Sequence, residues 1–267
     1  MPYQSSGSRR NNVQLGVGQS IWAGTPPPAI PERVLDGIPG YLAWLSLLVC
    51  IVLSFGYPRI LLLIAALVGF YSAFRFLLAG IFNVIGLRKI KAWKQTDWRA
   101  EYDAQADADS LAWDSVQHVV IVPNYKEPLD VLRCTLQSLA AQYQSRRSMT
   151  VVLAMEAAED NCAEKAAQLV KEFRGQFANL SYTVHPRGLP GEMQCKSANE
   201  AWATRWVKRQ LVDDMGYDID HILVTTMDAD TTWHENQFAM LACQFALNPQ
   251  RHLRFWQGPI RYHGNIW

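Results

Sequence analysis

Two long apolar runs dominate the first third of the chain. They cover residues 38–55 and 60–82, and only Gly56-Tyr57-Pro58-Arg59 separates them. Each run approaches the roughly 20 residues that a helix needs to cross the hydrocarbon core of a membrane. The pattern predicts a hairpin of two transmembrane helices over residues 38–86. The alternative interpretation is a pair of core helices buried inside a soluble protein.

Basic residues flank this hairpin on both sides. Arg33 precedes it, five basic residues follow it within residues 88–99, and the connecting loop offers only Arg59. Positive charge near membrane helices favours the cytoplasmic side, so we expect a multi-pass membrane protein whose remaining chain is cytoplasmic. Arg75 lies inside the second run, where a charge is costly. It is expected to snorkel to the cytoplasmic boundary or to belong to an interfacial segment.

Polar segments lie before and after the hairpin. Residues 1–37 are rich in Ser, Gly, Asn, Gln and Pro, and their composition predicts a disordered arm. Residues 87–117 become polar after the hairpin, and we interpret them as a cytoplasmic linker that is helical in part. The linker contains Asp107-Ala108-Asp109. No strand precedes that tripeptide, so it is interpreted as a solvated acidic loop.

Strand patterns alternate with helix patterns through residues 118–267. Strands are predicted at residues 119–122, 150–155, 180–184 and 222–227, helices at 129–143, 163–177, 196–211 and 238–247, and extended chain at 253–256 and 260–262. Such alternation predicts an α/β fold with a mostly parallel sheet that is covered on both faces.

Charge and cysteine usage narrow the classes of function. The chain has 25 Lys and Arg against 24 Asp and Glu, so no basic surface suggests a nucleic-acid partner. The five cysteines are odd in number, and neither they nor the six histidines have metal-ligand spacing. The cysteines are therefore expected to be reduced thiols.

The predicted strand over residues 222–227 ends in Asp228-Ala229-Asp230. Side chains alternate along a strand, so the two carboxylates would point to one side and Ala229 to the other. Neighbouring carboxylates repel each other, and a hard divalent ion with oxygen ligands would relieve the repulsion. The alternative is a turn after a strand, where Asp is common.

Further polar residues follow the other predicted strands. Asn124, Tyr125 and Glu127 come after the first strand, and Glu156 comes after the second. Ligands of open α/β sheets lie beyond the carboxyl ends of the strands, so these residues are expected to gather with the two aspartates. No glycine-rich phosphate loop occurs, and a phosphate would depend on a metal and on single cations such as Lys196. The alternatives are a helix cap for Glu127, a solvated turn for Glu156 and a surface position for Lys196.

Four ordered segments resemble the family-2 glycosyltransferases. VVIVPNYKEPLDVLRCTLQSL resembles the opening strand and helix of that family, LPGEMQCKSANEAWA its Lys…Asn segment, and LVTTMDADTTW its D-x-D element. FWQGPIRYHGNIW resembles the strand that follows in the membrane-embedded members. The resemblance spans residues 118–267, and it implies a Rossmann-like A-type glycosyltransferase domain.

The resemblance also implies a role for each matching residue. The predicted donor-binding residues are Pro123, Asn124, Tyr125, Glu127, Glu156, Lys196, Asn199 and Asp228. Asp228 and Asp230 would hold Mg²⁺ or Mn²⁺ at the diphosphate. The expected partners are a nucleotide-sugar donor with UDP as the default nucleotide, a glycan or lipid acceptor, and membrane lipids. The expected reaction inverts the anomeric carbon.

The sequence departs from the family after the D-x-D element. The family's acidic base and its Q-x-x-R-W element do not occur up to Trp267. We therefore expect residues 1–267 to be the N-terminal part of a longer protein, with the base beyond Trp267. Two other functions stay open, a nucleotidyltransferase and a non-catalytic, membrane-tethered module that binds nucleotide sugars.

Overall fold

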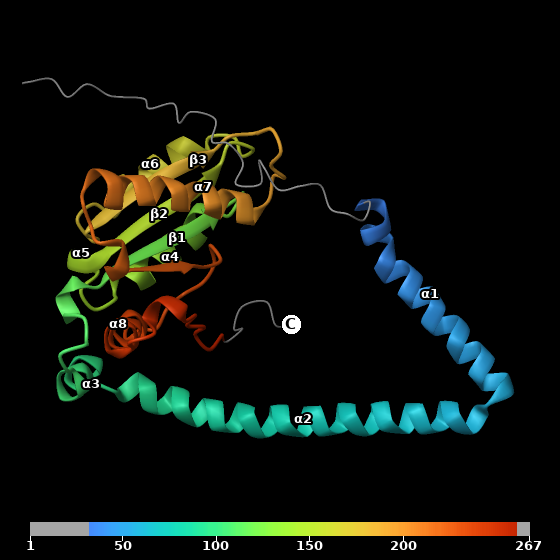
Figure 1. Ribbon diagram of the computed structural model, residues 1–267. Coiled ribbons are helices and arrows are strands. Elements are labelled where there is room, and N and C mark those ends of the chain that lie inside the picture. Colours follow the sequence, from blue (N-terminus) through green and yellow to red (C-terminus); the bar gives the residue numbers. More distant parts are fainter. Residues whose placement is uncertain (1–31, 261–267) are drawn as a thin grey trace, which may run out of the picture. The chain divides into compact units, whose positions relative to one another are not determined.

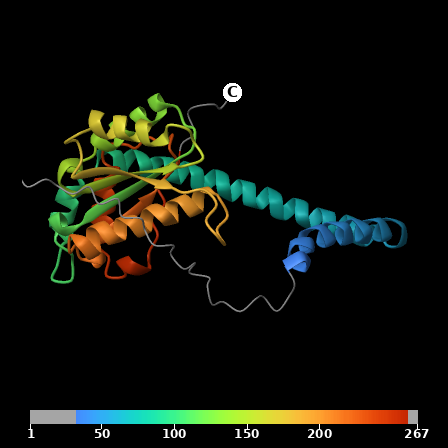
Figure 2. The same ribbon diagram turned by 90° about the horizontal axis from the view of Figure 1, so that it is seen from above.

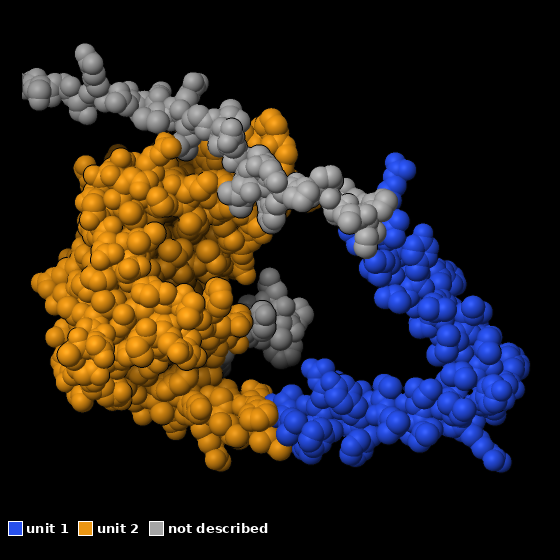
Figure 3. All heavy atoms as spheres, viewed as in Figure 1, with its two compact units in different colours: residues 1–79 blue, residues 80–267 orange. Residues whose placement is uncertain are grey.

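The computed structural model describes residues 32–260. The chain divides into two compact units, residues 1–79 and 80–267 (Figure 3). Most of the arm that was predicted over residues 1–37 lies outside the described residues. Helix α1 already begins at Glu32, so the end of that segment is helical.

Two long helices correspond to the two apolar runs. Helix α1 covers Glu32–Gly56 and α2 covers Pro58–Gln95, with Tyr57 between them (Figure 1). Both are long and apolar enough to cross a membrane, and the apolar window of each helix has none of its residues buried. Phe55, for example, is 88% exposed. Exposed apolar surface of this extent is rare on soluble monomers, so the alternative of two buried core helices is wrong for this structure.

The second unit is built on a four-stranded sheet. The strands are β1 (Gln117–Asn124), β2 (Met149–Glu156), β3 (Asn179–His185) and β4 (Ile222–Thr226). Their order is β3-β2-β1-β4 and all three pairings are parallel. The predicted α/β class and parallel sheet are confirmed. The chain moves outward from β1 to β3 and then crosses back, so the direction of progression reverses between β1 and β4.

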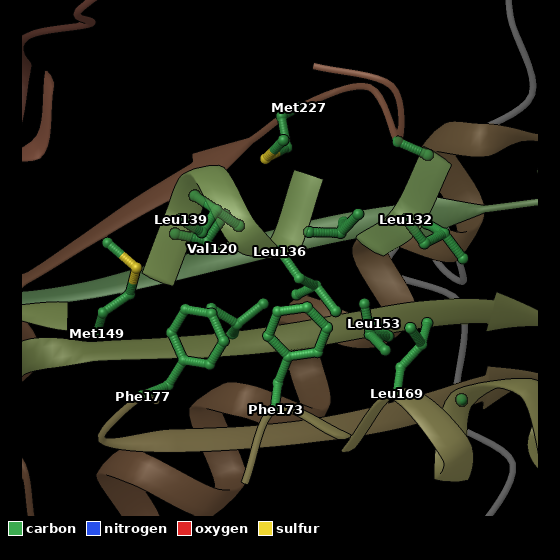
Figure 4. Packing of buried hydrophobic residues seen from close by; sticks show 14 of the residues in the cluster. Val120, Leu132, Leu136, Leu139, Met149, Leu153, Leu169, Phe173, Phe177 and Met227 are labelled. Carbon is green, nitrogen blue, oxygen red and sulfur yellow. The ribbon is translucent and has the colours of Figure 1, made fainter. Parts of the chain in front are cut away.

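Helices cover both faces of this sheet, as the continuous apolar run along β1 requires. Val120 and Val122 pack in one core cluster with α4 (Leu129–Ala140) and α6 (Cys162–Glu172). Val119 and Ile121 pack in another with α7 (Lys196–Lys208). Figure 2 shows α6 and α7 on opposite sides of the sheet. Figure 4 shows Phe173 and Phe177 beside β2 in the first cluster.

A further cluster joins α3 (Trp98–Gln105) to α8 (Gln237–Leu247). Trp98 and Tyr102 of α3 are buried in it against one side of α8. Phe238 and Leu241 of α8 belong to the core cluster on the sheet. Helix α8 is therefore buried on two sides, which explains its almost continuous apolar sequence.

Short helices complete the described residues. They are α5 (Ser145–Ser148), the 3-10 helices η1 (Trp113–Ser115), η3 (Ile219–His221) and η4 (Arg251–Leu253), and the π-helical turn η2 (Arg209–Asp214).

Several predicted boundaries are wrong for local reasons. Helix α6 was predicted to reach Phe177 but ends at Glu172, and Gly175 follows in the left-handed region with φ +76°. Helix α7 was predicted to reach Leu211, but its last turn is π-helical. No strand forms within residues 253–260, although Arg254 has an extended backbone with φ −117° and ψ 145°. Tyr262, in the second predicted extended segment, lies outside the described residues.

Candidate functional site

A cavity of about 590 Å³ opens at the carboxyl edge of the sheet. It is lined by Pro123, Asn124, Tyr125, Glu127, Glu156, Ala158, Gln194, Cys195, Lys196, Asn199, Asp228, Ala229 and Asp230. All of the predicted donor-binding and metal-binding residues are in this lining. The cavity therefore lies where the strand order reverses beside β1, the usual ligand position in open α/β sheets.

The loop after β1 is held by a carboxylate from the turn that follows β2. Glu159 Oε2 accepts hydrogen bonds of 2.8 Å from Asn124 Nδ2 and from the backbone N–H of Lys126. Lys126 has a left-handed backbone with φ 63°, a conformation that is unfavourable for a residue with a side chain. Glu159 thus fixes the strained loop that carries Tyr125 and Glu127 into the cavity.

Lys165 completes this clamp. Its Nζ forms an ion pair with Glu159 and donates a 2.9 Å hydrogen bond to the carbonyl of Glu127. Burial acts to raise the pKa of Glu159. The hydrogen bonds from Lys165 and Lys126 and the charge of Lys165 together have a larger, opposite effect, so the pKa lies below its usual value. The sequence did not indicate this role for Glu159. Its partners lie 33 and 35 residues away in the β1 loop, at a separation that shows no local pattern.

Glu156, at the end of β2, is buried beside His185 at the end of β3. The two residues are register partners in the parallel ladder. His185 Nδ1 lies 3.2 Å from both carboxylate oxygens of Glu156, and Gln194 Nε2 donates to Oε2 at 3.4 Å. The alternative of a solvated turn at Glu156 is therefore wrong.

Helix α7 brings Asn199 and Lys196 to the cavity. Asn199 is 1% exposed, and its Nδ2 donates a 2.8 Å hydrogen bond to the carbonyl of Ala154 on β2. Lys196 Nζ forms an ion pair with Asp228 and lies 3.8 Å from Glu200 Oε1. Burial raises the pKa of Glu200, against the opposing charge of Lys196. Among the described residues, no side chain caps the start of α7, and helix N-termini favour anions.

The Asp228-Ala229-Asp230 tripeptide lies just beyond β4, not within it. The strand ends at Thr226, and Thr231 N donates a 3.1 Å hydrogen bond to the carbonyl of Asp228, which closes a turn. Ala229 is buried, and its carbonyl accepts a 2.6 Å hydrogen bond from Thr135 Oγ1 of α4. Both aspartates are exposed, with 71% of the Asp228 side chain accessible. The predicted alternation holds although the strand has ended.

The donor set suits a cation that arrives together with an anionic ligand. Within residues 32–260, no group of three or more His, Cys, Asp or Glu side chains could hold a metal ion. Asp228 and Asp230 offer two carboxylates, and Mg²⁺ typically binds one or two carboxylates together with substrate phosphates and water. The residues therefore fit a shared metal and phosphate site better than a permanent metal centre.

The structure thus defines a parallel α/β unit with a charged cavity at the carboxyl edge of its sheet. Comparison of the sequence with models of known families gives no match, and comparison with curated proteins gives none.

Proposed function

We propose that the chain is a membrane-bound glycosyltransferase. It would take a nucleotide sugar, with UDP as the first nucleotide to test, and pass the sugar with inversion to a glycan or lipid acceptor. The observation that carries this proposal is the gathering of all nine predicted donor-binding and metal-binding residues around one cavity. They come from three strand ends and one helix start, as a donor site at the carboxyl edge of a parallel sheet requires.

The cavity offers a different chemistry to each part of such a donor. The half-exposed ring of Tyr125 and the buried side chains of Asn124 and Glu156 suit a nucleoside. Lys196 and the start of α7 suit the diphosphate. A Mg²⁺ or Mn²⁺ ion held by the aspartates would offset the charge that develops on the leaving diphosphate. Lys196 would then exchange its partner Asp228 for a phosphate oxygen.

The two apolar helices support a membrane location for this activity. Nothing in the described chain covers their apolar side chains, and a bilayer would do so. The basic residues that follow the second apolar run favour a cytoplasmic position for the α/β unit. Nucleotide sugars would then reach the cavity from the cytoplasm.

The two other functions differ in what they require of the same cavity. A nucleotidyltransferase would normally need a glycine-rich, basic loop after the first strand, and the loop after β1 contains no glycine. A non-catalytic module would bind the donor without consuming it. We keep the glycosyltransferase as the conclusion, and turnover of the donor separates it from the module.

Thiol labelling tests the proposal at the cavity itself. Cys195 is exposed and lines the cavity, Cys134 is exposed on α4, and Cys162 and Cys243 are buried. A nucleotide sugar with Mn²⁺ is expected to slow maleimide labelling of Cys195 in the full chain and to leave Cys134 unchanged. Release of nucleoside diphosphate is followed in the same samples. Labelling of Cys195 that no nucleotide sugar slows, with or without metal, would contradict the proposal.

A further inference from the structure

We propose that His185 is a positioning residue that makes the cavity select nucleobases with an N–H donor on the ring. The proposal rests on the proposed function, because it concerns the base of the donor nucleotide. His185 itself does not line the cavity. It would act through Glu156, which does.

The backbone places the two side chains together. Glu156 and His185 are register partners at the ends of β2 and β3, and Ala157 N donates a 3.0 Å hydrogen bond to the carbonyl of His185. Arg187 Nε donates to the carbonyl of Ala157 at 2.8 Å and ties the two strand ends again. The imidazole can therefore move little relative to the carboxylate.

The surroundings of His185 favour one orientation of its ring. The side chain is 2% exposed, and Trp202 of α7 packs edge-on against it with ring centroids 5.8 Å apart. Nε2 lies 3.6 Å from Glu192 Oε1, and Arg205 lies 3.8 Å from the same carboxylate. Nδ1 faces both oxygens of Glu156 at 3.2 Å. In the tautomer with hydrogen on Nδ1, this nitrogen donates to the carboxylate.

A buried carboxylate needs hydrogen-bond donors of this kind around it. Glu156 is 6% exposed, and a buried polar group without hydrogen-bond partners costs free energy. His185 Nδ1 and Gln194 Nε2 supply two donors, whereas a carboxylate has about four lone-pair sites. The remaining sites can accept a hydrogen bond from a donor group in the cavity. The pair thus presents a fixed acceptor to the cavity.

Nucleobases differ in whether they can meet a fixed acceptor. Uracil carries N3–H and guanine carries N1–H, whereas cytosine and adenine present an unprotonated ring nitrogen at the same edge. A carboxylate oxygen can accept a hydrogen bond from uracil or guanine, but it faces a lone pair on cytosine or adenine. Without the His185 donor, the Glu156 side chain would be free to turn, and its oxygens would no longer be held toward the cavity. Discrimination between the two pairs of bases would then be lost.

The test is calorimetry with the full chain in detergent and Mn²⁺, using UDP, GDP, CDP and ADP. The wild-type chain is expected to bind UDP or GDP about tenfold more tightly than CDP and ADP, as one hydrogen bond to a charged group provides. His185→Phe keeps an aromatic ring beside Trp202 but removes the donor. It should weaken UDP or GDP binding about tenfold and leave CDP nearly unchanged. His185→Asn places an amide N–H near the position of Nδ1 and should restore the preference.

Two controls make the result specific. His221→Phe removes a histidine that lies outside the cavity lining and should change no affinity. UDP methylated at N3 lacks the donor hydrogen and should bind the wild-type chain about tenfold more weakly than UDP. Because this control uses only the wild-type chain, misfolding of a variant cannot affect it.

Each contrary outcome has a distinct meaning. Equal weakening of all nucleotides in His185→Phe would assign His185 a purely structural role and overturn the inference. A wild-type chain that binds nucleotides without preferring UDP or GDP would also overturn it while leaving the donor site intact. A wild-type chain that binds no nucleoside diphosphate would overturn the proposed function as well.

Discussion

The two sides of the cavity are built in opposite ways. On the β1 and β2 side, Asn124 and Glu156 are buried and Glu159 is 12% accessible, and all three are hydrogen-bonded to partners on other elements. On the β4 side, Asp228 and Asp230 are exposed on a turn, and Lys196 pairs with the first of them. The buried side has a fixed shape, and the exposed side has charges that can exchange partners.

This difference indicates which part of a ligand each side can recognise. Fixed, desolvated polar groups discriminate strongly because a wrong partner leaves them unpaired. Exposed carboxylates discriminate little by shape, but they bind cations and rearrange at small cost. In a nucleotide with a metal-bound diphosphate, the base would suit the buried side and the metal-bound diphosphate would suit the exposed side. Substitutions on the buried side should therefore mainly lower the stability of the chain, and substitutions on the exposed side should mainly lower its activity.

The largest effect is expected on the exposed side. In the proposed site, Asp230→Ala would remove one of the two carboxylates that hold the cation, and donor turnover should fall about 100-fold or more. Thermal stability should not change, because the side chain is exposed. Asp220→Ala, an exposed aspartate at the opposite end of β4, is the matched control. Loss of folding in Asp230→Ala would contradict the division between the two sides.

The second-largest effect is expected on the buried side of the cavity. Glu159→Gln removes the charge that pairs with Lys165 and should destabilise the chain by about 2 to 3 kcal/mol. Tryptophan fluorescence during denaturant unfolding of the full chain measures the loss. Lys165→Met added to Glu159→Gln should recover part of the stability, since no buried charge is then left unpaired. A double variant less stable than Glu159→Gln would show that the ion pair is not the cause.

Acid should lower the stability of the folded chain through His118, which lies at the amino end of β1 and outside the cavity lining. Burial lowers the pKa of His118 to about 4 from an ordinary value of about 6.5, so the folded chain keeps it neutral. Its contribution to stability is complete above the unfolded pKa and is lost as the pH falls toward the folded pKa. The loss at pH 5 should be about 2 kcal/mol. His118→Leu should remove this pH dependence, and an unchanged slope between pH 7 and pH 5 would contradict the assignment.

The smallest effect is expected on a surface away from the cavity. Arg133 pairs with Asp130 at 2.8 Å and with Glu172 at 3.0 Å, and all three side chains are at least partly exposed. Arg133→Ala should change the free energy of unfolding by less than about 1 kcal/mol. It serves as the baseline for the Glu159 variants. A loss as large as that of Glu159→Gln would show that burial does not distinguish the two ion pairs.

Sequence patterns predicted the parts of this fold that depend on short-range periodicity. The β-branched run at residues 222–226 and the valines of β1 indicated strands, and the gathering of Glu156 and Asp228 followed from the parallel order of strand ends. The sequence did not indicate Glu159 or His185 as partners of the site residues. Their contacts join residues 29 to 35 positions apart, and only the assembled sheet brings them together.

Predictions near element ends failed for a related reason. The sequence after β4 continues the strand alternation, but the chain forms a turn there, which the hydrogen bond from Thr135 to the carbonyl of Ala229 ties to α4. Phe173 and Phe177 continue an apolar pattern, yet the helix ends before them and both rings pack on the sheet from the following turn. Tertiary packing decided these boundaries, not propensity.

The central claim is that the exposed aspartates and the buried strand ends form one donor site. Calorimetric titration of the full chain with UDP, with and without Mn²⁺, tests it most directly. We predict that UDP binds only with Mn²⁺, that Mn²⁺ alone binds weakly, and that Asp230→Ala abolishes the metal dependence together with most of the affinity. UDP binding that is equally tight without metal, or unchanged in Asp230→Ala, would contradict the claim.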